Sequence, residues 1–180
     1  FGQAWSPIAI KIQTDHPKEY RAIFGEVLLL LFFVMLAVGG AVALFSGELI
    51  NFIMPAEYIT SSLPLSILCF GIVLQATQQV TAIGISIEKK THLFAYIAWA
   101  TAVVNFVLNW LLIPAFGANG AAWATLISYL ILTISYTGFT QRLHPMIIPW
   151  GRLFCLLTLG AVIATVAVIM VADAFSLLAF

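Results

Sequence analysis

Long apolar stretches, separated by short polar segments, dominate the chain. No Asp, Glu, Lys or Arg occurs within residues 27–47, 58–87, 91–141 or 153–172. A helix rises about 1.5 Å per residue, so about 20 apolar residues cross the roughly 30 Å hydrocarbon core of a bilayer. Uncharged stretches of this length predict membrane-spanning helices.

The stretch 91–141 is long enough for two spans, and Pro114 with Gly117 predicts the turn between them. The pattern therefore predicts an all-α, polytopic transmembrane bundle with five full spans, at residues 24–46, 63–87, 93–113, 119–139 and 152–173.

Residues 1–12, FGQAWSPIAIKI, have the composition expected at the end of a sixth span. The spans are too long and too many for a cleavable signal peptide, and position 1 is not Met. We therefore expect the chain to be part of a larger polytopic membrane protein.

Composition and charge placement support this prediction. The chain is 63% hydrophobic and 8% charged, whereas a typical globular domain is about 25% charged. All seven Lys and Arg residues fall within residues 1–23, 88–92 and 140–152, at alternate ends of the predicted spans. Cytoplasmic loops are enriched in Lys and Arg, so loops 13–23, 88–92 and 140–152 are predicted to be cytoplasmic in a cell (inner or plasma) membrane protein.

Three amides interrupt the second predicted span at mid-depth. Gln75 and Gln79 share one helix face, and Gln78 lies on a neighbouring edge. An amide in hydrocarbon without a partner costs about 2–7 kcal/mol, so the three are expected to face other helices or a wet cavity. Interhelical hydrogen bonding and contact with a polar substrate both remain open as their role.

Two further amides, Asn105 and Asn109, are four residues apart and therefore on one face of the third predicted span. Packing against a neighbouring helix is the favoured interpretation for this pair. A substrate-facing position in a cavity is the alternative, and both residues are kept as candidate substrate-binding residues.

The sequence lacks the residue patterns of metal sites, of catalytic and nucleotide-binding motifs, and of nucleic-acid binding. Cys69 and Cys155 lie in different predicted spans, and no Cys/His set has metal-ligand spacing. No catalytic, phosphate-binding or dinucleotide motif is present, and no basic face suits nucleic acid. The sequence therefore predicts no enzyme activity, no metal and no cofactor.

The most specific segment is NFVLNWLLIPAFGANGAAWATLIS, residues 105–128. Together with AWSPIAIKI, Glu57-Tyr58 in an outer turn and the Lys89-Lys90 hairpin, it resembles the C-terminal lobe of polysaccharide (O-antigen type) flippases. These belong to the multidrug/oligosaccharidyl-lipid/polysaccharide exporter superfamily.

The resemblance implies two six-helix lobes around a central cavity that works by alternating access. By this likeness residues 1–140 form a partial C-terminal lobe, without its amino-terminal counterpart. Residues 141–180 then form a cytoplasmic link and the additional C-terminal helix of fourteen-helix members. The implied cargo is a polyprenyl-diphosphate-linked oligosaccharide, such as a lipopolysaccharide O-antigen repeat unit. The implied partners are the bilayer and polysaccharide-assembly membrane proteins.

Three alternatives are weighed against this hypothesis. A multidrug or cation antiporter of the same superfamily would need a carboxylate at mid-depth, and the spans have none. A flippase for peptidoglycan lipid precursors would be expected to have more cationic cavity residues. A membrane polysaccharide polymerase would need a large polar outer loop, whereas the outer loops here are short and contain no Arg.

Overall fold

The computed structural model describes the backbone of residues 2–178, and the side chains of this range except those of residues 2, 3, 56 and 171–178. Every regular element in the described range is a helix. In chain order they are α1 (Gly2–Asp15), α2 (Tyr20–Leu44), α3 (Ser46–Ile53), the 3-10 helix η1 (Ala56–Ser61), α4 (Ser62–Thr81), α5 (Ile83–Ile87), α6 (His92–Phe116), α7 (Ala118–Leu143) and α8 (Trp150–Leu178).

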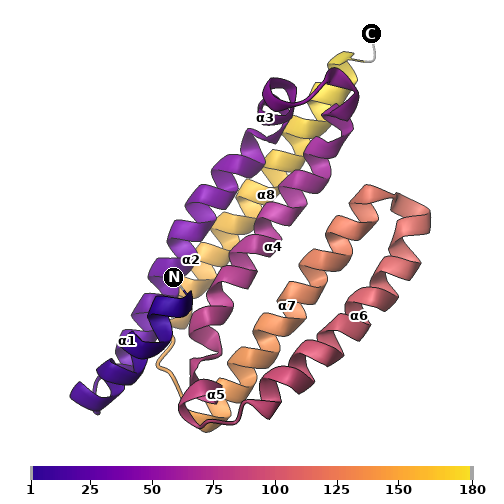
Figure 1. Cartoon of the computed structure of the whole chain (residues 1–180). Helices are drawn as coiled ribbons and strands as arrows, with labels where there is room; N and C mark the ends of the chain where they lie inside the picture. The colour runs from indigo at the N-terminus through magenta and orange to yellow at the C-terminus, as the bar shows by residue number, and fades with distance from the viewer. Residues whose placement is uncertain (1, 179–180) are drawn as a thin grey trace.

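Five of the described segments are long and apolar enough to cross a membrane, which confirms the expected polytopic bundle. They are Tyr20–Leu44, Glu57–Ile87, His92–Phe116, Ala118–Leu143 and Trp150–Met170. The helices lie side by side with short connections, and their ends gather at two opposite ends of the molecule (Figure 1). The chain is therefore that of a multi-pass membrane protein.

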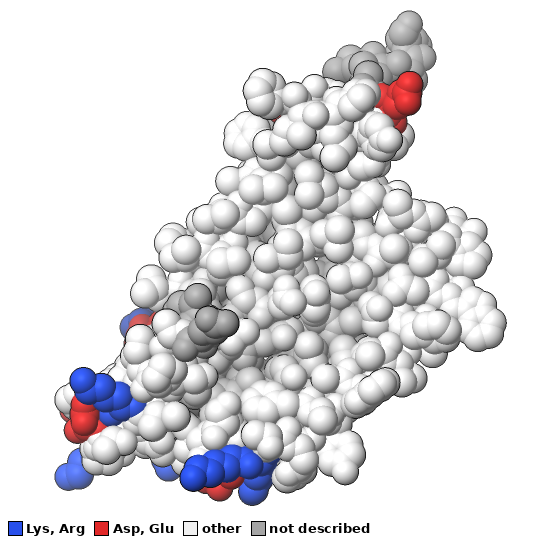
Figure 2. All heavy atoms as spheres, viewed as in Figure 1, with Lys and Arg blue, Asp and Glu red and all other residues white. Residues whose placement is uncertain are grey.

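Positive charge is concentrated at one end of this bundle, which is called the charged end below. Figure 2 shows the visible Lys and Arg side chains around the lower end, where α1 ends and α2 begins and where α5 leads into α6. The opposite end holds α3, η1 and the α6–α7 turn (Figure 1). The alternation of basic segments in the sequence thus corresponds to one basic end in space.

The centre of the bundle is formed by α2, α4 and α7. In Figure 1, α8 lies along α2 and α4 on one side, and α6 lies on the far side of α7. Small residues allow close approach of neighbouring backbones, which is how helices associate in lipid. A Cβ at Gly39 would come within 2.9 Å of Val73, and one at Gly120 within 2.6 Å of the carbonyl carbon of Leu112.

Several helix boundaries differ by two or more residues from those expected from the sequence, and two of these differences lie at turns of the chain. The second span is one helix only to Thr81, because the backbone turns at Ala82 before α5 completes the crossing. The third span continues past Pro114 to Phe116. Proline removes only one backbone donor, and so close to the helix end the chain can still complete its last turn. Gly117 then makes the turn with φ of 57°, a value that glycine adopts without strain.

The link between α7 and α8 is tied to the charged end. The backbone N–H of Ile147 donates to the Arg21 carbonyl at 3.1 Å. The side chain of Gln141 donates to the Met146 carbonyl at 3.1 Å and accepts from the Met146 N–H at 3.0 Å. Nε2 of His144 lies 2.8 Å from a carboxylate oxygen of Glu88. These contacts hold the link against the start of α2 and the end of α5.

Candidate functional site

The three candidate glutamines lie on α4, slightly toward the charged end from the middle of its span. Gln75 and Gln79 are exposed, and neither forms a hydrogen bond with any residue that the structure describes. They share this exposed face with Ile72, which is 51% exposed. Spacings of three and four residues place these side chains in one stripe. The face therefore combines two free amides with apolar surface at membrane depth.

Gln78 is placed differently from the other two. Its side chain is half-buried, and its amide nitrogen is fully buried without a hydrogen-bond partner among the described residues. A buried donor without a partner costs about 1–3 kcal/mol. Gln78 is therefore a partly buried polar group with an unsatisfied donor among the described residues, and it is not part of the exposed stripe.

Several threonine hydroxyl groups lie near the glutamines, although these threonines were not among the site residues predicted from the sequence. Thr77 and Thr81 are buried on α4, and Thr140 is buried on α7. The hydroxyl of Thr133 on α7 donates to the Leu74 carbonyl of α4 at 3.3 Å. The signal was present in the sequence, because spacings of four and three place Thr133, Thr137 and Thr140 on one face of a helix. Thr133 thus links α7 to α4, and Thr140 packs against Gly84 of α5.

The two asparagines take part in a hydrogen-bonded chain. The side-chain nitrogen of Asn105 on α6 donates to the Ser128 hydroxyl on α7 at 3.1 Å. Ser128 in turn donates to the carbonyl of Ala124 at 2.7 Å. Asn109 donates to the side-chain oxygen of Asn105 at 3.0 Å and to its backbone carbonyl at 2.9 Å. Both side chains are half-buried, so they are partnered within the helix pair without being fully enclosed.

The structure does not gather the five candidates into one constellation. The glutamines are on α4 and the asparagines on α6, while α7 packs against both of these helices. The hydrogen bonds of the asparagines go to Ser128 and to each other. The exposed Gln75–Gln79 face is therefore considered separately from the Asn105–Asn109 pair.

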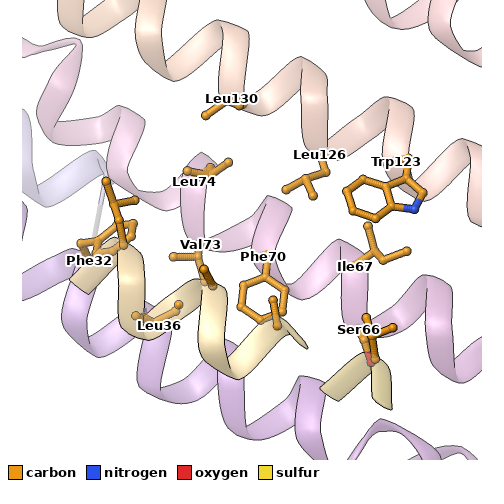
Figure 3. A pocket seen from close by; sticks show the side chains of 15 residues that line it. Phe32, Leu36, Ser66, Ile67, Phe70, Val73, Leu74, Trp123, Leu126 and Leu130 are labelled. Atoms are coloured by element: carbon orange, nitrogen blue, oxygen red, sulfur yellow. The ribbon is translucent and has the colours of Figure 1, made fainter. Parts of the chain in front are cut away.

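An apolar groove of about 410 Å³ occupies another side of α4. Figure 3 shows its floor on α4, with Ile67, Phe70 and Leu74, and one wall on α7. The second wall is formed by α2 and α8. At 3.6 residues per turn, Gln79 lies roughly half a turn round α4 from Phe70. The amide face and the groove are thus on opposite sides of the same helix.

Ionisable side chains are not gathered at mid-depth. No group of three or more His, Cys, Asp or Glu residues that could hold a metal ion occurs among the described residues. Glu26 pairs with Arg152 and Glu88 with His144, in both cases at the charged end. The side chain of Asp173 lies outside the described residues. The chemistry available in the middle of the described bundle is that of neutral hydrogen-bonding groups.

Comparisons with known proteins give one informative relative. No family model matches the chain, and no solved structure matches it. Over 98 residues it is 28% identical to a protein of Haloferax volcanii named probable low-salt glycan biosynthesis flippase Agl15. The match covers 54% of this chain and 21% of the relative's length. The chain is thus a multi-pass membrane protein with distant similarity to part of a glycan flippase.

Proposed function

We propose that this chain is part of a transporter that flips a polyprenyl-diphosphate-linked oligosaccharide across the cell membrane by alternating access. The observation that supports the proposal is the exposed pair Gln75 and Gln79 on a membrane-spanning helix, without partners among the described residues. Each amide would cost about 2–7 kcal/mol if hydrocarbon covered it, so this face calls for polar surroundings.

Amides suit a sugar cargo because each offers two N–H donors and a carbonyl acceptor. They match the hydroxyl groups of a glycan in both hydrogen-bonding directions without binding it as tightly as charged groups would. A transporter must release its cargo, so weak and multiple contacts fit this task. In this proposal Gln75 and Gln79 contact the glycan directly, while Gln78 and the threonines between α4 and α7 support the face.

The same arrangement supports a transporter rather than an enzyme. Glycosyl transfer or hydrolysis needs an acid/base pair near the reacting bond. The described carboxylates of this chain lie toward the ends of the bundle. They are in the ion pairs above, in the α3–η1 region, or between the end of α1 and the start of α2. The similarity to a protein named as a glycan biosynthesis flippase gives the proposal further support. The lipid-linked carrier and the O-antigen class of cargo remain parts of the proposal.

The test is the triple substitution of Gln75, Gln78 and Gln79 by Leu in the full-length protein. We expect membrane insertion to be unchanged and flipping to be lost, measured as surface polysaccharide in cells and as transfer of a fluorescent lipid-linked oligosaccharide in proteoliposomes. A matched control replaces Thr158 and Thr165 by Leu. These threonines are exposed on α8, and each bonds only a carbonyl of its own helix, so the control should transport normally. A normal amount of surface polysaccharide in cells with the triple variant would contradict the proposal.

A further inference from the structure

A second hollow lies between α2 and α8, near the charged end of the bundle. Its volume is about 370 Å³. Its lining combines one acidic and one basic side chain with apolar and weakly polar groups: Glu26, Leu29, Leu30, Phe33, Arg152, Cys155 and Leu156. The hollow is thus charged at one end and apolar along its length.

The two charged side chains form an ion pair whose other hydrogen-bonding positions are still accessible. Nη1 of Arg152 donates to both carboxylate oxygens of Glu26, at 2.8 and 2.9 Å. The other two guanidinium nitrogens have no protein acceptor among the described residues. The Arg152 and Glu26 side chains are 67% and 58% exposed. Exposed ion pairs contribute little to stability, so stabilisation of the fold does not explain why these two charged residues are present here.

The apolar part of the hollow faces outward from the bundle. Leu30 is 63% exposed and Phe33 is 52% exposed, and both lie on α2 within the span. Arg152 lies in the first turn of α8, one turn before Cys155 and Leu156. A molecule that fills the hollow therefore meets a zwitterionic pair at the membrane boundary and hydrocarbon below it.

We propose that this hollow binds a phospholipid with a phosphoethanolamine headgroup. The phosphate accepts hydrogen bonds from the free nitrogens of Arg152, whose planar guanidinium suits phosphate oxygens. The primary ammonium donates to the Glu26 carboxylate. One acyl chain lies along Leu29, Phe33 and Leu156. The lipid belongs to the leaflet at the basic end of the bundle.

Charge complementarity selects this headgroup over the other common ones. Phosphatidylglycerol offers a phosphate to Arg152 but no cation to Glu26, so the carboxylate is left facing an anionic headgroup. Phosphatidylcholine has the same charges, but its quaternary ammonium has no N–H to donate to the carboxylate. A headgroup with both a phosphate and a primary ammonium satisfies both members of the pair. Phosphoserine also has these two groups, but its additional carboxylate would lie near Glu26 and be repelled. The hydrocarbon chain distinguishes a lipid from free phosphoethanolamine, which would leave the apolar part unfilled.

Native mass spectrometry of the full-length protein can test this site. The protein is equilibrated with equimolar dioleoyl phosphatidylethanolamine, phosphatidylcholine and phosphatidylglycerol, and the retained lipids are counted. We expect phosphatidylethanolamine to be retained about threefold to fivefold over each of the others, as one exposed charged contact would give. Free phosphoethanolamine added in excess should not displace it.

Substitutions at the two members of the pair should have different effects, one on the selectivity between lipids and the other on the total retention. Glu26→Gln should remove the preference for phosphatidylethanolamine and raise the retention of phosphatidylglycerol. Arg152→Gln should weaken retention of all three lipids, and Arg152→Lys should recover part of it. The matched control is Glu57→Gln, an exposed position at the opposite end of the bundle. An unchanged lipid ratio in Glu26→Gln, or an equal change in Glu57→Gln, would overturn the proposal.

Loss of folding would not be mistaken for loss of the site. Both residues of the pair are exposed, so the variants should elute as the unsubstituted protein does in size-exclusion chromatography. Cys155→Leu provides a second measurement, because it fills part of the apolar hollow without touching the ion pair. It should lower the retention of all three lipids while keeping their ratio. Unaltered retention in Cys155→Leu would also count against the proposal.

Discussion

The side-chain nitrogen of Asn105 lies 3.1 Å from the hydroxyl oxygen of Ser128, which joins α6 to α7 at the middle of the membrane span. This bond is important because α6 is among the least buried of the five spans: only 11% of an apolar 18-residue stretch of this helix is buried. In lipid, apolar surface alone does not hold two helices together, so packing and such polar contacts do. This bond is thus one of the specific links between α6 and the bundle.

Removal of the Asn105–Ser128 bond should weaken the α6–α7 pair by a small amount. We expect a double-mutant cycle of Asn105→Ala and Ser128→Ala to give a coupling of about 0.6 kcal/mol, and at most about 1.7 kcal/mol. The measurement is unfolding in mixed micelles, followed by the loss of helicity. A coupling of zero would mean that the two side chains do not interact in the bilayer.

A methyl group at Gly120 should force α6 and α7 apart. The Cβ of an alanine there would meet the backbone carbonyl of Leu112, which cannot move without shifting α6. We expect Gly120→Ala to destabilise the protein by about 1–3 kcal/mol, as overpacking does. Gly138→Ala on the same helix is the control, because nothing lies within 4 Å of its Cβ position. The melting temperature of the control should not fall; equal losses in both variants would contradict the close contact.

Substitutions of Gln78 and Gln75 by Leu should have different effects on the stability of the protein. The buried amide nitrogen of Gln78 has no partner among the described residues, so Gln78→Leu should be neutral or stabilising by about 1 kcal/mol. Gln75→Leu should leave stability unchanged and lower transport, since its side chain is exposed. Thermal unfolding and a flipping assay measure the two effects. A clear destabilisation by Gln78→Leu would show that this amide has a partner in the full-length protein.

The Ser66 hydroxyl should stabilise the junction between α2 and α3. It lies 3.0 Å from the Ala43 carbonyl of α2 and 2.8 Å from the Ser46 hydroxyl, and all three groups are buried. Ser66→Ala leaves two buried polar atoms without this partner, and we expect a loss of about 1–3 kcal/mol. Ser135→Ala is the control, because its hydroxyl bonds only a carbonyl of its own helix. Unfolding midpoints that fall equally in the two variants would refute this.

Cysteine labelling should distinguish the two ends of the bundle. In a Cys155→Ser background, which removes the exposed thiol, we expect Glu57→Cys to react with a membrane-impermeant maleimide in intact cells. Lys18→Cys and Arg142→Cys should react only after the membrane is permeabilised, because the positive-inside rule places their loops in the cytoplasm. Cys69 is buried and should not react in either case. Labelling of Lys18→Cys from outside would reverse the proposed topology.

The number and type of the elements could be predicted from the sequence for a local reason. A run of about 20 apolar residues must satisfy its backbone hydrogen bonds within itself in a bilayer, and the helix does so. The uncharged stretches and the alternation of basic segments therefore predicted five spans, which the structure confirms. The break at Ala82 was not predicted, because IGIS has no proline or charged residue to mark it.

The sequence by itself determined that Asn105 and Asn109 share one face and that Gln75 and Gln79 share another, because helix periodicity is a local property. Only the tertiary structure decided which neighbours these faces meet. Asn105 donates a hydrogen bond to Ser128. The amide nitrogen of Gln78 is buried, whereas the side chains of Gln75 and Gln79 are exposed. Lipid and the interior of a helix bundle are both apolar, so hydropathy does not distinguish a lipid-facing side from a packed one. Contacts between segments far apart in the chain make that distinction.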